Sequence, residues 1–419
     1  MPQNKPSGKT ICVVGLGYIG LPTALLLADA GNQVLGFDVD QIKIKQLEAG
    51  LLPFSEHGLP ELFATVQNKR TFTATTSIQS ADVYIIAVPT PHTGKSADLQ
   101  YIVAALSSIK PVFPKNGTIV IESTVGPRDC IDILEPLVAA WEIPFSFAHC
   151  PERAIPGNTL HEMVHNERIV GGRTPADTKK VITLYSTFVQ GKLHGTTTTV
   201  AASCKVMENT YRAVNIALAN EFALIAEQLE FNVWEAISLA NKHPRVNIHA
   251  PGPGVGGHCI PIDPWFFAQT QQEVPSVIST ALTINDTMPS HVVKQVEREI
   301  KLLKLQKPVI GILGLSYKKN VDDTRESPGF PIIKKLQETF SVMITDPYVT
   351  HSPAMTITSL EEVLHSADVI VLITDHDEYT SCNFSSYPNI SVVLDTRNIL
   401  SEIQFVKFQG IWKTLGNGA

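Results

Sequence analysis

The sequence predicts an α/β protein in which two doubly wound parallel-sheet domains are joined by a helical middle domain. Short apolar runs that end in turn residues recur in the first 125 residues and again after Pro308. Such runs are typical of strands in a parallel sheet that is covered on both faces. Between them, residues 200–229 contain no Gly or Pro, and Ala, Leu and Glu recur at helical spacing. The expected domains are residues 1–199, 200–300 and 301–419.

A strand, a glycine turn, a helix and a second strand open the chain. The β-branched run Thr10–Val14 leads into Gly15-Leu16-Gly17-Tyr18-Ile19-Gly20, an apolar stretch follows, and Val34–Phe37 ends at Asp38. In this context the glycines allow a tight turn, close approach of a pyrophosphate, and close helix–strand packing, which is typical of a Rossmann-like dinucleotide site. Asp38 is expected to bond the ribose 2′-OH of NAD and, with Asp40, to repel the 2′-phosphate of NADP. NAD is therefore the predicted cofactor.

Two later strands are expected to end near the same cofactor. Thr90 follows the apolar run Val83–Val88, and Thr124 follows Thr118–Ile121. Ligands of such folds lie at the carboxyl ends of strands, so each threonine is either a ligand contact or an ordinary turn residue.

The C-terminal part repeats the pattern of the N-terminal part. Ser366-Ala367-Asp368 before an apolar run echoes Ser80-Ala81-Asp82, and the segment Val309–Gly314 resembles a degraded copy of the first glycine turn. The repeat predicts a second Rossmann-like domain.

Composition excludes several classes of protein. The 419 residues carry a net charge of −7, without the basic excess that a nucleic-acid binder uses. No apolar run reaches the roughly 18 residues of a membrane helix. The N-terminus lacks the apolar segment of a signal peptide, and the six cysteines are scattered, so a reduced cytoplasmic location is expected. No His pair has metal-binding spacing within a recognised motif, so no metal is predicted.

A candidate nucleophile lies in a loop rich in Gly and Pro. Cys259 follows the glycines of residues 252–257 and precedes Asp263 by four residues. An isolated Cys is usually a small buried hydrophobe, but this setting makes Cys259 a credible nucleophile. Lys205 and Asn209, at i and i+4 of the predicted helix, point to one side.

These motifs occur in an order that resembles the UDP-glucose/GDP-mannose dehydrogenase family. The motifs are GLGYIG, AVPTP, EST, CPER, Lys205 with Asn209, GVGGHC with Asp263, and DTRESP at residues 323–328. The stretch from His243 to Phe266 is similar to the branch that acts on UDP-N-acetylhexosamines. Ile262 stands where the UDP-glucose branch commonly has Lys, which argues against UDP-glucose.

The resemblance implies an NAD-dependent four-electron oxidation of a sugar C6 hydroxymethyl group to a carboxylate, for surface polysaccharide biosynthesis. The expected substrate is UDP-N-acetyl-D-mannosamine, and UDP-N-acetyl-D-glucosamine stays open. Lys205 and Asn209 would stabilise the developing alkoxide, and Cys259 would capture the aldehyde as a thiohemiacetal that becomes a thioester. Asp263 or Glu152 would orient the hydrolytic water. A homodimer is expected, with Arg245 reaching the partner's substrate.

The resemblance also assigns binding residues. Thr124 joins the catalytic set. Cofactor contacts are expected from Gly15, Gly17, Tyr18, Ile19, Gly20, Asp38, Lys43, Thr90, Thr124 and Arg325. Substrate contacts are expected from Glu152, Arg153, Ala154, Ile155, Lys205, Asn209, Arg212, His243, Arg245, Gly256, Tyr317, Lys318 and Arg397.

Two other functions remain open at this point. A two-electron β-hydroxyacid dehydrogenase would share the first domain and a Lys/Asn helix, but would lack Cys259 and the second Rossmann-like domain. A non-catalytic NAD-responsive binding protein would give no reason for Lys205, Cys259 and Asp263 to occur together.

Overall fold

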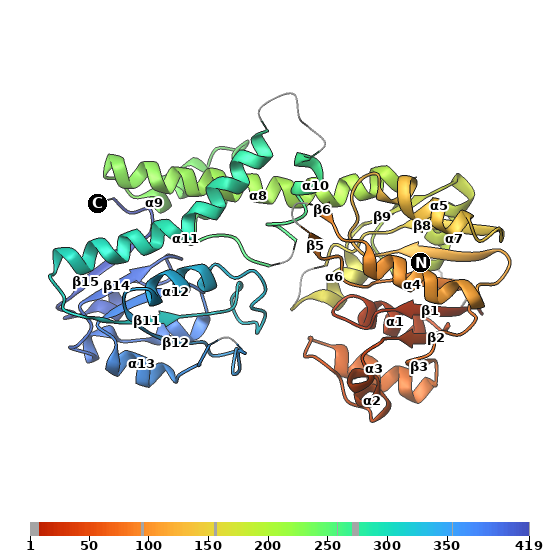
Figure 1. Ribbon diagram of the computed structural model, residues 1–419, viewed down its shortest axis with the longest axis horizontal. Coiled ribbons are helices and arrows are strands. Elements are labelled where there is room, and N and C mark those ends of the chain that lie inside the picture. The colour runs from red at the N-terminus through yellow and green to blue at the C-terminus, as the bar shows by residue number, and fades with distance from the viewer. Residues whose placement is uncertain are drawn as a thin grey trace. The chain divides into compact units, whose positions relative to one another are not determined.

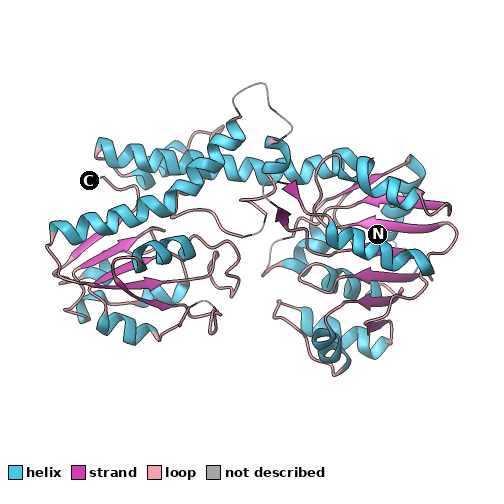
Figure 2. Ribbon diagram, in the orientation of Figure 1, coloured by secondary structure: helices cyan, strands magenta, loops and turns pink. Residues whose placement is uncertain are grey.

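The computed structural model describes residues 8–93, 96–154, 157–257, 259–269, 276–353 and 355–418. The chain divides into two compact units, Met1–Glu208 and Asn209–Ala419. Each unit contains one large sheet with helices on its faces (Figure 1, Figure 2). The prediction of two doubly wound parallel-sheet domains with a helical region between them is confirmed. The predicted three-part boundaries remain a prediction.

The first unit is built on an eight-stranded sheet with the order β10-β9-β8-β7-β4-β1-β2-β3. Neighbouring strands are parallel except β8 and β9. The chain moves from β1 to β2 and β3 on one side and returns to β4 on the other, which is a topological switch point. The strands are β1 Thr10–Val14, β2 Gln33–Phe37, β3 Phe72–Thr75, β4 Val83–Ile86, β7 Gly117–Ile121, β8 Phe145–His149, β9 Arg168–Gly172 and β10 Leu193–Thr197. A separate hairpin is formed by β5 His92–Thr93 and β6 Ser96–Ala97.

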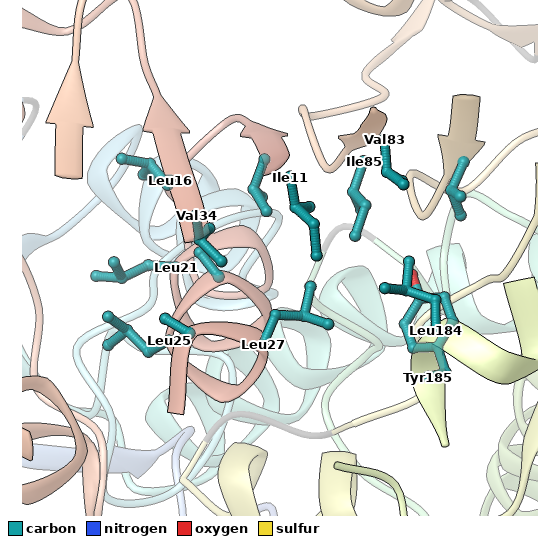
Figure 3. Close-up of a cluster of buried hydrophobic side chains, with 14 of the residues drawn as sticks. Ile11, Leu16, Leu21, Leu25, Leu27, Val34, Val83, Ile85, Leu184 and Tyr185 are labelled. Carbon is teal, nitrogen blue, oxygen red and sulfur yellow. The ribbon is translucent and has the colours of Figure 1, made fainter. Parts of the chain in front are cut away.

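Both faces of this sheet are covered because its strands are apolar on both sides. Ile11 and Val13 of β1 pack with helices α1, α2, α3 and α7, whereas Cys12 and Val14 pack with α4 and α5. Figure 3 shows the first cluster, where side chains of the strands meet Leu27 and Tyr185. The helices are α1 Gly20–Asp29, α2 Gln41–Glu48, α3 Leu59–Lys69, α4 Gln100–Ile109, α5 Glu135–Ala139, α6 Thr159–His165 and α7 Pro175–Tyr185, with a 3₁₀ turn (η1, Lys110–Val112) and a π-helical turn (η2, Cys130–Leu134).

The register of the first sheet brings the ends of five strands to one edge. Val14 pairs with both Phe37 and Ile86, Ile86 pairs with Ile121, and Ile121 pairs with His149. The residues that follow β1, β2, β4, β7 and β8 therefore emerge side by side.

The second unit repeats this plan in a parallel five-stranded sheet with the order β12-β11-β13-β14-β15. Helices α11 and α12 pack on one face, and α13 packs on the other. The strands are β11 Val309–Leu313, β12 Ser341–Thr345, β13 Val369–Leu372, β14 Val392–Asp395 and β15 Ile411–Thr414. The helices are α9 Val233–Ala240, α10 Trp265–Ala268, α11 Val277–Leu302, α12 Gly329–Gln337 and α13 Leu360–Ser366, with 3₁₀ turns η3 Asp377–Ser381, η4 Phe384–Ser386 and η5 Glu402–Phe405.

The predicted internal repeat is present in atomic detail. Gly15 and Gly314 both have positive φ, at 93° and 98°. Asp82 accepts from the backbone N–H of Thr10 at the start of β1, and Asp368 accepts from Val309 at the start of β11. Equivalent positions therefore make equivalent bonds in both sheets.

The long helix predicted for residues 200–229 is α8, Thr198–Leu229, and the boundary between the two units lies inside it. The second predicted helix, after Asn232, is α9, whose first turn is capped by the Asn232 side chain. Within the residues that the structure describes, no helix has the length and hydrophobicity that crossing a membrane requires.

Candidate active site

The three glycines of the first turn meet different surroundings. A Cβ atom on Gly15, which has positive φ, would lie 2.7 Å from the Ala87 carbonyl oxygen, and one on Gly20 would lie 1.8 Å from the Gly15 carbonyl oxygen. A Cβ atom on Gly17 would have no atom within 4 Å. Gly15 and Gly20 thus allow the turn and the close packing of α1, whereas Gly17 leaves open space at the start of α1. No side chain caps α1 at Ile19, and a helix N-terminus of this kind fits a pyrophosphate.

Asp38 is fixed at the end of β2, beside the glycine turn. One carboxylate oxygen accepts from the Leu16 N–H at 2.8 Å and from the Lys43 ammonium at 2.6 Å, and the other accepts from the Asp40 N–H at 3.0 Å. Burial opposes the charge, but Lys43 and these N–H donors together lower the pKa of the Asp38 carboxyl below its usual range. An ionised acceptor at this position fits the ribose of NAD.

Other predicted cofactor residues lie along the same edge of the sheet. The Thr90 hydroxyl oxygen is buried, and it has no hydrogen-bond partner within the described parts of the chain. A buried polar atom of this kind fits a ligand that would complete it. Thr124 follows β7 and is half-buried, and the partly exposed Tyr18 ring packs on Phe54 with centroids 4.4 Å apart.

The CPER segment leaves the neighbouring strand β8 and carries the next predicted residues. One oxygen of Glu152 accepts from the N–H groups of Arg153 and Ala154, at 2.6 and 2.8 Å, and the other binds Arg168. The Arg153 guanidinium forms an ion pair with Glu208 at 2.6 Å. The predicted substrate contact Ile155 lies outside the described residues.

His149, the last residue of β8, was not predicted as a site residue. Its side chain is buried, and its Nδ1 lies 2.8 Å from the carbonyl oxygen of Ile121. Because a carbonyl only accepts, Nδ1 carries the proton and Nε2 presents a lone pair, which has no partner among the described residues. Burial, and then the nearby charge of Lys205, lower the pKa of His149 to about 4. The imidazole is therefore neutral at physiological pH.

In the second unit, Cys259 and Asp263 lie on one turn. The Cys259 carbonyl accepts from the N–H groups of Ile262 and Asp263, at 3.1 and 2.8 Å. The buried Asp263 carboxylate accepts from the Asn209 amide at 2.5 Å, and the Asn209 amide oxygen in turn accepts from the Arg212 guanidinium. The structure thus joins the predicted residues Asp263, Asn209 and Arg212 in one chain of hydrogen bonds. The Asn209 amide is oriented by Asp263 at its nitrogen and by Arg212 at its oxygen.

The thiols of the chain differ in their surroundings. Burial raises the pKa of Cys12 and Cys150 to about 12 and the pKa of Cys382 to about 11, and it also raises the pKa of Cys130. Buried thiols with a raised pKa are poor nucleophiles because the thiolate is the reactive form. Cys204 and Cys259 are partly exposed, and none of the six cysteines, all within the described chain, forms a disulfide.

The glycines before Cys259 pack against residues of the domain that contains the five-stranded sheet, within the same unit. A Cβ atom on Gly256 would lie 2.5 Å from Cβ of Tyr317, and one on Gly252 would lie 2.8 Å from the Arg397 guanidinium. The Gly257 N–H donates to the carbonyl oxygen of Arg325 at 2.9 Å. The loop therefore places Gly256 beside Tyr317, Gly257 beside Arg325, and Gly252 beside Arg397.

The remaining predicted substrate residues, and the predicted cofactor residue Arg325, have the following partners. The Lys318 carbonyl accepts from Ser316, and the Arg325 side chain is paired with Asp323 at 2.6 Å. The Arg397 Nε donates to the Ile373 carbonyl at 2.9 Å. His243 and Arg245 are exposed. The described residues contain no group of His, Cys, Asp and Glu side chains that could hold a metal ion.

The C-terminal copy of the glycine turn differs from the first at its acidic residue. Asp346 follows β12 as Asp38 follows β2, and it accepts from the Leu315 N–H at 2.7 Å. Its carboxylate also lies 3.1 Å from Nε2 of the fully buried His376. Nδ1 of His376 accepts from the Asn320 N–H, so Nε2 donates to Asp346. The Asp346 carboxylate is therefore hydrogen-bonded by groups of its own domain.

Comparison with known proteins finds matches along nearly the whole chain. The models of the NAD binding, central and UDP binding domains of the UDP-glucose/GDP-mannose dehydrogenase family match residues 9–189, 199–287 and 311–402. A UDP-N-acetyl-D-mannosamine dehydrogenase of Methanocaldococcus jannaschii is 44% identical over 94% of this chain and 93% of its own length. One of Methanococcus maripaludis is 43% identical over 98% of each chain. The solved structure of a UDP-D-ManNAc dehydrogenase from Pyrococcus horikoshii has a TM-score of 0.91, with 38% identity over 98% of this chain and 99% of that one.

The fold and the first-unit site are those of an NAD-dependent dehydrogenase. The chain belongs to the UDP-glucose/GDP-mannose dehydrogenase family, whose members are NAD-dependent nucleotide-sugar dehydrogenases. This membership confirms the predicted enzyme class and cofactor, and it decides against the two-electron hydroxyacid dehydrogenase and the non-catalytic binding protein.

Proposed function

We propose that the enzyme oxidises the C6 hydroxymethyl group of UDP-N-acetyl-D-mannosamine to a carboxylate, giving UDP-N-acetyl-D-mannosaminuronate. The names of its relatives, at 43–44% identity over nearly the whole chain, support this substrate. One observation supports the four-electron course above others: Cys259 shares a turn with Asp263, and Asn209 holds the Asp263 carboxylate at 2.5 Å. A two-electron oxidation has no use for a nucleophile beside an oriented carboxylate.

The residues act in sequence on one carbon atom. NAD, when bound, accepts the hydride that leaves C6 in each of the two oxidations. Lys205 and Asn209 stabilise the negative charge that develops on the C6 oxygen. The Cys259 thiolate adds to the aldehyde, which keeps it bound as a thiohemiacetal, and the second oxidation converts this adduct to a thioester. Water, oriented by Asp263 or Glu152, hydrolyses the thioester and releases the thiolate with the sugar acid.

Residues at the edge of the first sheet hold the cofactor in this proposal. The open side of Gly17 and the N-terminus of α1 receive the pyrophosphate, and Asp38, with Lys43 beside it, binds the ribose. Thr90 and Thr124 contact the cofactor where β4 and β7 end. In the second unit, Tyr317, Lys318 and Arg397 bind the substrate diphosphate.

The active form is proposed to be a homodimer that buries one face of α8. Exposed apolar residues recur along this helix at spacings of seven and four, which places them on one stripe. They are Val200, Met207, Tyr211, Leu218, Ile225 and Leu229. Apolar stripes of this length on a helix are typical of helix–helix interfaces. The exposed Arg245 is the residue that would reach the partner's substrate.

We place the enzyme in the cytoplasm, because all six cysteines are thiols.

The count of NADH per sugar acid tests the covalent course. The wild-type enzyme should form two NADH per uronate and release no aldehyde. Cys259→Ala should retain the first oxidation and lose nearly all of the second, because no thiohemiacetal can form. Cys204→Ala is the matched control, since Cys204 is the other partly exposed thiol, and it should keep the ratio of two. An unchanged ratio of two in Cys259→Ala, with near wild-type turnover, would end the proposal.

A panel of nucleotide sugars tests the substrate. UDP-N-acetyl-D-mannosamine should give the highest kcat/KM. A higher value with UDP-N-acetyl-D-glucosamine would change the assigned sugar and leave the chemistry in place.

A further inference from the structure

One guanidinium lies at the centre of a buried polar cluster in the first unit. The Arg168 cluster consists of Thr23, Glu122, Glu152, Arg168 and Tyr185, which come from five separate parts of the chain. The side chains of Arg168, Glu122 and Glu152 are 4, 0 and 8% exposed. Burying charges without water requires that each be paired and hydrogen-bonded.

Every member of the cluster is hydrogen-bonded to another member. Arg168 donates to Glu122 at 3.1 Å with one terminal nitrogen and to Glu152 with the other. Glu122 also accepts from the Tyr185 hydroxyl at 2.5 Å and from the Thr23 hydroxyl at 3.0 Å. The Tyr185 ring lies under the guanidinium, 4.7 Å from its centre. Burial and the Glu122 carboxylate hold the pKa of Tyr185 well above its usual range, so Tyr185 remains a neutral donor.

The cluster lies at the edge of the sheet where the site residues emerge. Glu122 directly follows β7, and Glu152 follows β8 by three residues. Strand β9 is antiparallel to β8 and pairs with it through Gly171 and Gly172, so Arg168, the first residue of β9, extends beyond the end of β8. Thr23 lies in the first turn of α1, the helix that begins at the glycine turn. The cluster therefore connects that helix to the CPER segment.

We propose that Arg168 is a positioning residue of the oxidation: it holds the Glu152 carboxylate ionised and in one orientation, with Glu122 as the second anchor of the guanidinium. This inference rests on the proposed function, in which Glu152 serves the sugar or the hydrolytic water. A carboxylate in either role must keep its orientation within a fraction of an ångström, since misplacement by about 1 Å can cost about 100-fold in rate. The rigid fork of Arg can bind two carboxylates at once, whereas a Lys ammonium is a single point donor on a flexible chain.

Substitutions of Arg168 and Glu122 separate positioning from plain structural support. Arg168→Lys keeps the charge and loses the fork, so kcat should fall about 10- to 100-fold, while the dissociation constant of NAD stays within about twofold. Arg168→Met alone leaves two unpaired buried carboxylates and is expected to fold poorly. Arg168→Met combined with Glu122→Gln keeps the net charge of the cluster and should fold, yet it removes the guanidinium from Glu152 and should lose as much kcat as Arg168→Lys.

Tyr185→Phe is the matched control. It removes a hydrogen bond from Glu122 and keeps the ring under the guanidinium, so it should lower the melting temperature and leave kcat within about twofold.

A second readout does not depend on turnover. In protein labelled with ¹³C at the Glu carboxyl carbons, the signal lost in Glu152→Gln should titrate at higher pH in the double variant than in wild type, because a nearby cation stabilises the carboxylate.

The outcomes are distinct. A folded double variant with wild-type kcat, or with an unchanged Glu152 titration, would overturn the proposal for Arg168. A wild-type enzyme that does not oxidise the UDP-N-acetylhexosamines would overturn the proposed function, and the Glu152 titration would still decide whether Arg168 controls this carboxylate.

Discussion

Two single-methyl substitutions in the glycine turn should separate binding of NAD from folding of the first unit. Gly17→Ala adds a methyl group where no atom lies within 4 Å, whereas Gly20→Ala adds one 1.8 Å from the Gly15 carbonyl oxygen. The first group enters open space at the start of α1. The methyl group of Gly20→Ala must displace backbone, because the atom that it meets, the Gly15 carbonyl oxygen, belongs to the main chain of the same tight turn.

The expected magnitudes follow from these distances. Gly20→Ala is an overpacking substitution against backbone, which costs roughly 3 kcal/mol. For a unit of about 200 residues this loss corresponds to a fall of roughly 6–12 °C in Tm. Gly17→Ala should leave Tm unchanged or raise it slightly, since replacing Gly by Ala at a compatible position stabilises by about 0.4–1 kcal/mol. It should nevertheless weaken NAD binding at least tenfold, about 1.4 kcal/mol, because the methyl group occupies the approach of the pyrophosphate.

Differential scanning calorimetry and titration of NAD into each variant provide the two measurements. Wild-type affinity for NAD in Gly17→Ala would refute the assignment of that open space to the pyrophosphate. A wild-type Tm in Gly20→Ala would refute the packing argument, because it would mean that the turn can open without cost.

Three further predictions concern pH, cofactor choice and assembly. His149 has its pKa lowered to about 4 from 6.5, so its neutral burial contributes stability that is fully present above pH 6.5 and is lost as the pH falls. At pH 5 the free energy of unfolding should be about 2 kcal/mol lower than at neutral pH on account of His149. Urea unfolding of His149→Gln at the two pH values should lack this decrease. Asp38→Ser should lower the preference for NAD over NADP at least 100-fold in kcat/KM, because it removes the acid and releases Lys43 from its 2.6 Å ion pair; equal use of both cofactors by wild type would contradict the argument. Leu218→Glu with Ile225→Glu should shift the enzyme to monomers in sedimentation velocity, and a wild-type enzyme that is active as a monomer would rule out the proposed dimer.

The fold was predictable because its signals are local. The glycine turn with its acid, the apolar strands and the Gly- and Pro-free helix each follow from a few neighbouring residues. The second copy was recognisable even where its turn is degraded, because Asp368 repeats the role of Asp82 at the start of a strand. The pairing of Asp346 with His376 was not predictable, since 30 residues separate them and no spacing rule connects an acid to a His on another strand end.

The candidate site was predictable only in part, for the same physical reason. Asp263 and Asn209 were both expected to act, but their contact joins residues 54 positions apart. Arg168 and His149 were missed because a buried Arg or His looks in sequence like an exposed one. A weak signal did exist for His149, which ends the aromatic run of β8, where a parallel sheet places its functional side chains. Arg168 offered no such signal, because it begins β9 and that strand runs antiparallel to β8.

The boundary inside α8 limits how this enzyme can be divided or recombined. Lys205 belongs to the first unit and Asn209 to the second, yet they lie one turn apart on a single helix. A chimera that exchanges one unit for that of a relative at residue 208 would join two half-helices within α8. If a single residue were gained or lost at the junction, the direction of Asn209 relative to Lys205 would turn by about 100°, because each residue rotates the helix by that angle. Crossover points for such chimeras belong before Thr198 or after Leu229, so that the whole of α8 is inherited from one parent.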